Sequence, residues 1–154
     1  MLILEKYPLC IDKQINKTTR TNIVLKENRR RYCLVNSRND WVVTKVHVEN
    51  CIIKDIGEKG CEAILLAEQK HYKSKGYYIE LKGVSVRHAL KQIENSLNKT
   101  VADLQDVILF GRIIPSEYKR TRFLETQEQK LTLRFKKLGG NFIIRENFEE
   151  EISI

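Results

Sequence analysis

The amino-acid sequence predicts a protein of the α/β class, in which helices pack on a mixed β-sheet. Two observations lead to this prediction. Runs of apolar and β-branched residues come first, and helix-like and strand-like segments then alternate, which is typical of a mixed sheet flanked by helices. The 154 residues contain no repeat and no linker long enough to separate two domains. We therefore expect one domain over residues 1–154, which buries roughly two thirds of the surface that its unfolded chain would expose.

The first half of the chain is predicted to form strands. "TNIVLKE" and "RRYCLVN" flank a charged turn, which favours an antiparallel pair. "DWVVTKVHVENCII", residues 40–53, is dense in valine and isoleucine and predicts one long strand. Two further apolar runs, residues 61–67 and 76–83, are separated by a short polar segment. We expect these two runs to form a β-hairpin.

The second half begins with a predicted helix and a buried strand. Apolar residues recur at steps of three and four, which indicates a helix that starts after Ser85 as its N-cap. The stripe consists of Val86, Leu90, Ile93 and Leu97. The apolar run at residues 106–114 then predicts a buried strand that Pro115 closes.

A second helix is predicted from about residue 117 to residue 138. Ser116 is a candidate N-cap, and Gly139 and Gly140 end the helical pattern. "NFIIREN" predicts a last strand, and "FEEEISI" is interpreted as an acidic tail.

Composition narrows the class of protein and its surroundings. Hydrophobic residues at 42% and charged residues at 31% are typical of a globular chain, and a net charge of +8 permits contact with a polyanion. The start, "MLILEKYPLC", is only briefly apolar, and no later run reaches the length of a membrane span. We therefore expect neither a signal peptide nor a membrane-spanning segment.

The four cysteines are interpreted as reduced, partly buried thiols. Cys10, Cys33, Cys51 and Cys61 show no CxxC spacing, and a zinc site would require distant histidines to converge on them. Reduced thiols suit a cytoplasmic location.

An acid and a base share one face of the second hairpin strand. Strand side chains alternate between faces, so Glu80 and Lys82 project the same way. If the hairpin turns near His71 or Tyr72, Glu62 lies on that face too, nearly opposite them. A slip of one residue would separate Glu62 from the other two.

Two carboxylates and an ammonium group at one place favour metal-assisted chemistry. Neighbouring carboxylates repel each other, and a divalent cation removes that conflict. Mg²⁺, or Mn²⁺ in its place, binds carboxylate oxygens together with water and a substrate phosphate. Lys82 beside the metal would assist the attacking water, which predicts phosphodiester hydrolysis. The alternative is a plain salt-bridge cluster of Glu62, Glu80 and Lys82.

These residues resemble a known family. "CEAILLAEQKHYKSKGYYIELKG", followed by "VSVRHALKQIENSL", is similar to the PD-(D/E)XK nuclease superfamily, and to its small prokaryotic members in particular. The resemblance covers roughly residues 40–115. It implies a restriction-endonuclease-like core over about residues 40–147, with N-terminal strands over residues 1–39.

The resemblance also assigns roles to residues of this chain. Glu62 and Glu80 fall at the two metal-binding acids, and Lys82 falls at the catalytic lysine. Gln92 is placed like a helical glutamine that approaches the site in nuclease domains of recombination helicases. His88 and Asn95 lie on the same helix flank and are interpreted as solvent-facing, while both a site role and a surface role stay open for Gln92.

Some features depart from the family pattern. Glu49 and Glu62 stand where aspartate is expected, and no N-terminal helix with a further acid is evident. Glu49 either completes the acidic cluster or pairs with Lys45 or Lys54. A degenerate member that binds nucleic acid or a partner protein in a defence or repair complex is therefore the alternative to a DNA-cleaving enzyme.

Basic residues supply candidate contacts to DNA phosphates. Four of them lie on the second predicted helix, namely Arg120, Arg122, Lys130 and Arg134. The turn "NRRR" at residues 28–31 is a second candidate clamp. The family resemblance also allows a homodimer or a subunit of a larger complex.

Overall fold

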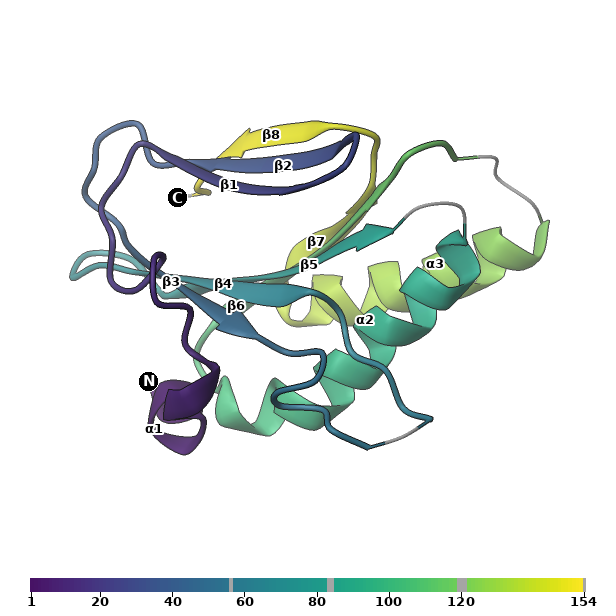
Figure 1. Ribbon diagram of the computed structural model, residues 1–154, viewed down its shortest axis with the longest axis horizontal. Coiled ribbons are helices and arrows are strands. Elements are labelled where there is room, and N and C mark those ends of the chain that lie inside the picture. The colour runs from purple at the N-terminus through teal and green to yellow at the C-terminus, as the bar shows by residue number, and fades with distance from the viewer. Residues whose placement is uncertain (56, 83–84, 119–121, 154) are drawn as a thin grey trace.

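The protein has three layers, as the computed structural model in Figure 1 shows. It describes residues 1–55, 57–82, 85–118 and 122–153, without the side chains of Lys82, Arg122 and Phe123. A five-stranded sheet forms the middle layer, a three-stranded sheet covers one of its faces, and two long helices cover the other. The predicted combination of mixed sheet and helices is confirmed.

The central sheet has the strand order β3-β4-β5-β6-β7. The strands are β3 (Val42–His47), β4 (Ala63–Glu68), β5 (Lys75–Lys82), β6 (Ile108–Pro115) and β7 (Gly139–Ile144). β3, β4 and β5 pair antiparallel, and β5, β6 and β7 pair parallel. The antiparallel pair of β4 and β5 confirms the predicted hairpin. Helices α2 (Val86–Thr100) and α3 (Arg122–Lys137) connect the parallel strands, which confirms the predicted alternation of helix and strand after the hairpin.

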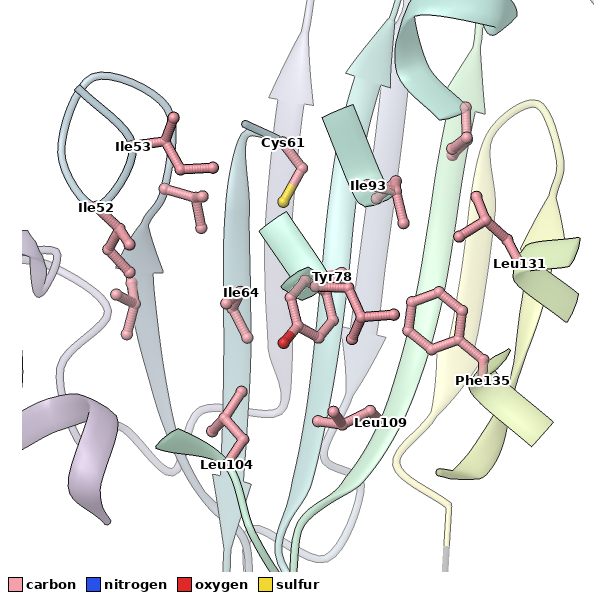
Figure 2. Packing of buried hydrophobic residues seen from close by; sticks show 14 of the residues in the cluster. Ile52, Ile53, Cys61, Ile64, Tyr78, Ile93, Leu104, Leu109, Leu131 and Phe135 are labelled. Atoms are coloured by element: carbon pink, nitrogen blue, oxygen red, sulfur yellow. The ribbon is translucent and has the colours of Figure 1, made fainter. Parts of the chain in front are cut away.

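Two hydrophobic cores lie on opposite faces of the central sheet. Figure 2 shows the first, where Ile64, Tyr78 and Leu109 of the sheet meet Ile93 of α2 and Phe135 of α3. All four residues of the predicted stripe on α2 are buried in this core. Ser85 caps the helix as predicted, because its Oγ accepts a hydrogen bond from the backbone N–H of His88 at 3.3 Å.

The second core lies between the two sheets. The smaller sheet has the order β1-β2-β8, and β1 (Asn22–Glu27) and β2 (Arg30–Val35) form the predicted antiparallel pair. The acidic tail was a wrong prediction, because Phe148–Glu151 form β8, which pairs parallel with β2. Phe148 anchors this strand in the second core, and Glu150, on the same face, pairs with the buried Arg112 at 2.6 Å, whereas Glu149 and Glu151 are exposed.

Several predicted boundaries are also wrong. The long strand of residues 40–53 ends at His47, because residues 48–53 fold into a turn in which the N–H groups of Cys51 and Ile53 bond to the carbonyl of Val48. The second helix starts at Arg122 instead of residue 117.

The N-terminus forms a short helix, α1 (Leu2–Lys6), which was not evident from the sequence. It carries Glu5 and contributes Ile3 to the first core. Two 3₁₀ turns, η1 (Pro8–Cys10) and η2 (Val101–Asp103), complete the described elements.

Within the described residues, no helix combines the length and the apolar character that crossing a membrane requires.

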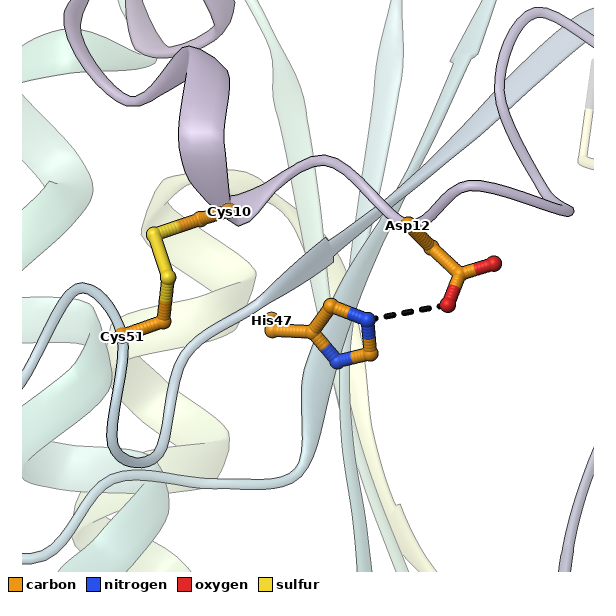
Figure 3. The surroundings of a disulfide bond; sticks show 4 residues. All are labelled: Cys10, Asp12, His47 and Cys51. Carbon is orange, nitrogen blue, oxygen red and sulfur yellow. Dashed lines mark hydrogen bonds and ion pairs between the residues drawn. A yellow bond between two sulfur atoms is a disulfide. The ribbon is translucent and has the colours of Figure 1, made fainter.

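Two of the cysteines form a disulfide bond, which corrects the expectation of reduced thiols. Cys10 and Cys51 are joined, with 41 residues of sequence separation, while Cys33 and Cys61 are free and buried. Figure 3 shows this bond beside a second contact that holds the N-terminal segment on β3. This contact is a hydrogen bond between His47 Nε2 and Asp12 Oδ1, which lie 2.9 Å apart. Partial burial of Asp12 opposes its ionisation, but the N–H groups of Ile15 and Gln14 and the His47 ring hold its pKa below the ordinary value.

Reduction of the disulfide should destabilise the chain. The bond closes a loop of about 40 residues, so its loss is expected to cost about 4 kcal/mol of unfolding free energy. Urea unfolding with and without a reductant measures this difference.

A variant with Cys10→Ser and Cys51→Ser is the matched control, because a reductant should not change its stability. The unreduced, denatured chain should show two reactive thiols per molecule, those of Cys33 and Cys61. Four reactive thiols, or equal stability with and without reductant, would contradict the assignment.

Candidate functional site

The hairpin of β4 and β5 brings Glu62 and Glu80 together. Ala63 pairs with Ile79, so Glu62, the residue before β4, lies opposite Glu80. This is the register predicted from the sequence. The backbone N–H of Glu62 donates a hydrogen bond to Oε1 of Glu80 at 2.8 Å, so the two acids are neighbours across the end of the hairpin.

Glu80 is a buried carboxylate. Its side chain belongs to the face of β5 that also carries Tyr78, on the side of the helices, and the residue is only 3% exposed. A hydrogen bond from a backbone N–H group fixes the direction of the carboxyl group that accepts it. Glu62, opposite Glu80, is half-buried.

The third predicted site residue, Lys82, is the last residue of β5. Its backbone pairs with Pro115 at the end of β6. Its side chain lies outside the described part of the structure, so the predicted contact with the two carboxylates stays a prediction.

Polar residues of α2 hold the segment that leads into Glu62. Gln92 Nε2 donates to the carbonyl of Gly60 and Asn95 Nδ2 donates to the carbonyl of Lys59, both at 3.0 Å. Ser96 Oγ accepts a hydrogen bond from the N–H of Cys61 at 2.8 Å. The interpretation of Asn95 as solvent-facing is therefore wrong, because its amide satisfies a backbone carbonyl 36 residues away. His88 is exposed, as expected.

Gln92 contributes to the site by positioning the segment before Glu62. The side chain is buried, and its Oε1 accepts no hydrogen bond from any described residue. Gly60 lies so close to the turn of residues 48–53 that an added Cβ would approach Val48 Cγ1 to 2.8 Å and Ile53 Cδ1 to 3.0 Å. Glycine at this position therefore permits the close approach that places Glu62.

The turn of residues 48–53 also holds the segment before β4, through hydrogen bonds to its backbone carbonyls. The N–H of Val48 donates to the carbonyl of Glu62 at 3.4 Å, and the N–H of Glu49 donates to the carbonyl of Cys61 at 3.1 Å. Burial raises the pKa of the Cys61 thiol far above its ordinary value, and the nearby charge of Glu80 acts in the same direction. Cys61 is thus a structural residue of this segment.

Glu49 does not join the two acids. Over the described residues, no three His, Cys, Asp or Glu side chains are grouped so that they would hold a metal ion. Nor does Glu49 form an ion pair with Lys45 or Lys54 in this part of the chain. A metal ion at this place would have only Glu62 and Glu80 of these acids as ligands, and water or a ligand oxygen would have to fill its remaining positions.

A basic groove runs between α2 and α3. It has a volume of about 760 Å³, and its basic lining residues are Arg87, Lys91 and Lys130, beside His88. One acid, Glu94, also lines the groove and pairs with Lys91 at 3.1 Å, so the three cations exceed the carboxylates by two. A smaller hollow of about 300 Å³ shares His88 and Lys91 and continues to Gln92, Asn95 and Lys59. The groove therefore leads toward the segment that carries Glu62.

The predicted phosphate contacts lie in different places. Lys130 lines the groove, whereas Arg134 is half-buried further along α3. Arg120 and the side chain of Arg122 lie outside the described residues. The turn at residues 28–31 belongs to the small sheet on the other face of the molecule. Arg87 and Lys91 were not singled out from the sequence, because exposed basic residues on a helix are common and only the packing of α2 against α3 brings them to the groove.

Removal of the Ser96 hydroxyl should weaken the segment before Glu62. Ser96→Ala leaves the buried N–H of Cys61 without an acceptor, so the unfolding free energy is expected to fall by about 1–3 kcal/mol. Urea unfolding measures the loss.

Thr132→Ala is a matched control, because Thr132 is exposed and its hydroxyl bonds only to a carbonyl of its own helix. A small, equal loss in both variants would contradict the role given to Ser96.

Comparison with known proteins adds no family to this picture. Among family models, curated proteins and solved structures, none matches the chain. A function is therefore inferred from the residues of the chain itself, in particular from Glu80, Glu62 and the groove beside them.

Proposed function

We propose that this protein is a metal-dependent nuclease that hydrolyses phosphodiester bonds of DNA, and that it is a member of the PD-(D/E)XK superfamily with a restriction-endonuclease-like core. One observation carries the proposal. The carboxylate of Glu80 is buried near the end of β5 and is fixed by the N–H of Glu62, the neighbouring acid across the hairpin. Lys82 follows two residues later on the same strand, and a capped helix comes next.

The donor set suits Mg²⁺ or Mn²⁺. Carboxylate oxygens are preferred ligands of Mg²⁺, which is commonly held by one or two carboxylates plus substrate phosphates. Glu62 and Glu80 come from adjacent strands, and these two residues would hold the metal. When bound, the metal would supply Lewis-acid chemistry and lower the pKa of a bound water.

Residues of the chain would position the acids, assist the attacking water and contact the phosphates. Glu80 provides a carboxylate whose direction is preset by a hydrogen bond, and Gln92 keeps the segment before Glu62 in place. Lys82 would orient the attacking water or stabilise the charge that develops on the phosphate. Arg87, Lys91 and Lys130 would contact phosphates along the groove, without any reading of base sequence.

A second candidate function is a degenerate nuclease fold that binds without cleaving. It is favoured by the small number of ligating groups, because Glu49 does not join Glu62 and Glu80 among the described residues. Such a module would bind nucleic acid through the basic groove, or a partner protein in a defence or repair complex.

Location and assembly stay predictions. The cytoplasmic location was inferred from reduced cysteines, and the Cys10–Cys51 disulfide removes that support, because structural disulfides persist mainly in oxidising compartments. A homodimer or a subunit of a larger complex is compatible with the proposal.

The catalytic proposal predicts cleavage of single- or double-stranded DNA by the purified chain in Mg²⁺ or Mn²⁺, and none in a chelator. Lys82→Ala and Glu80→Gln should each lower the rate at least about 100-fold. Gel-resolved cleavage of labelled DNA measures this.

Lys73→Ala and Glu68→Gln are matched controls that should cut normally, because these residues lie toward the other end of the hairpin. Absence of cleavage in both metals, or cleavage that survives Lys82→Ala, would refute the enzyme. Salt-sensitive DNA binding without cleavage would favour the degenerate module.

The groove predicts where DNA binds. A variant with Lys91→Gln and Lys130→Gln should bind DNA at least about tenfold more weakly. The slope of log affinity against log salt should fall by about 2, since each lost phosphate contact removes about 0.9. Fluorescence anisotropy with a short DNA duplex and a single strand at several salt concentrations measures both quantities.

Lys26→Gln with Lys99→Gln changes the net charge equally at exposed positions outside the groove. Equal weakening by both double variants would show that net charge, and not the groove, attracts DNA.

A further inference from the structure

The Cys10–Cys51 disulfide joins the N-terminal segment to the turn of residues 48–53 (Figure 3). Cys10 belongs to the 3₁₀ turn η1, and Cys51 belongs to the turn that follows β3. Cys10 is only 4% exposed, whereas Cys51 is half-buried. A reductant in solution therefore approaches the bond from the side of Cys51.

The turn that carries Cys51 also holds the backbone in front of β4. The N–H of Val48 donates to the carbonyl of Glu62 at 3.4 Å. The N–H of the next residue, Glu49, donates to the carbonyl of Cys61 at 3.1 Å. Both donors closely precede Cys51 in the same turn, so the disulfide restrains the backbone that positions Glu62.

The position of Glu62 in turn affects Glu80. The N–H of Glu62 donates to Oε1 of Glu80 at 2.8 Å, so a change in the backbone of Glu62 reaches both acids. Ile52 and Ile53 pack the turn against the first core. Reduction of the disulfide should therefore loosen the turn and the two acids without releasing them.

Other contacts hold the N-terminal segment when the bond is reduced. Ile3 is fully buried in the first core, and Lys6 Nζ lies 3.3 Å from Asp103 Oδ2. The N–H of Asp12 donates to the carbonyl of Lys45 on β3 at 2.9 Å. We therefore expect the reduced chain to be less stable but still folded.

We propose that the Cys10–Cys51 disulfide is a redox switch that controls how firmly Glu62 and Glu80 are held. The oxidised chain holds the two acids in place, and the reduced chain holds them loosely and binds a divalent cation more weakly. The effect on metal binding and cleavage rests on the proposed function, whereas the effect on the backbone of residues 60–62 does not.

The reductant that operates the switch is a dithiol. One of its thiolates attacks Sγ of Cys51, forms a mixed disulfide and releases the thiolate of Cys10. The second thiolate attacks the reductant's own sulfur in that mixed disulfide and releases the thiolate of Cys51. Two electrons and two protons pass to the cysteine sulfurs, and the dithiol becomes a disulfide. A disulfide oxidant reverses the reaction.

NMR relaxation of the backbone N–H groups tests the coupling in the absence of metal. After reduction with dithiothreitol, the order parameters of residues 48–53 and 60–62 should fall from about 0.85, typical of a rigid backbone, toward about 0.6. The internal control is β2 (Arg30–Val35), which lies in the small sheet and should keep its order parameters. Unchanged values at residues 60–62, or an equal fall in β2, would overturn the proposal.

Metal binding gives a second measurement. Calorimetry with Mn²⁺, after removal of the dithiothreitol, should show an affinity about tenfold weaker for the reduced chain, because ligand carboxylates depend on the groups that orient them. DNA cleavage should slow in parallel and recover after treatment with oxidised glutathione. Equal Mn²⁺ affinity in the two states would contradict the switch. Absence of both Mn²⁺ binding and cleavage in either state would refute the proposed function, and the order parameters alone would then decide the switch.

Two variants separate the switch from other effects of the reductant. Cys10→Ser combined with Cys51→Ser should resemble the reduced wild type in order parameters and Mn²⁺ affinity, and dithiothreitol should change neither. Cys33→Ala is the matched control, because it removes a free, buried thiol and keeps the disulfide. It should respond to dithiothreitol as the wild type does. A response of the double variant to dithiothreitol would overturn the assignment of the switch to this bond.

Discussion

The structure depends on β5, a strand that is buried on both of its faces. Its residues from Lys75 to Leu81 are buried, and β4 and β6 pair with it on either side. Tyr78 and Glu80 belong to the face under the helices, and Tyr77 and Ile79 to the face under the small sheet. A slip of one residue would exchange the two sets and move Glu80 into the core between the sheets, where its buried carboxyl group would lose the hydrogen bond from the N–H of Glu62. Packing on both faces therefore determines where the acid lies.

This constraint explains what could be predicted from the sequence. The alternation in "GYYIELKG" and the short polar turn before it were enough to place Glu62 opposite Glu80, and the pairing of Ala63 with Ile79 confirms that register. The helical stripe of α2 and the apolar run of β6 are equally local signals, so the order β5-α2-β6-α3-β7 followed from them. These local patterns determine the fold around the two acids, and the nuclease activity of the arrangement is a proposal.

The predictions that were wrong depend on contacts between distant parts of the chain. The Cys10–Cys51 bond joins residues that no spacing motif connects, and β8 becomes a strand because β2 offers it a free edge. Asn95 looked solvent-facing because it lies beside the apolar stripe, and its partner is a backbone carbonyl 36 residues away. Periodicity reports which face of an element is apolar, but it does not report which polar groups meet across the fold.

The two acids of the candidate site are held in different ways, and this bears on the glutamate at position 62. Glu80 lies within a strand that is fixed on both faces, so its backbone cannot adjust to a longer side chain. Glu62 precedes β4 in a segment held by side chains of α2 on one side and by the disulfide-linked turn of residues 48–53 on the other. These are individual hydrogen bonds instead of a continuous ladder. We expect a segment held in this way to adjust to the extra methylene of glutamate at a lower cost than a strand would, so the departure from aspartate at residue 62 is compatible with the proposed metal site.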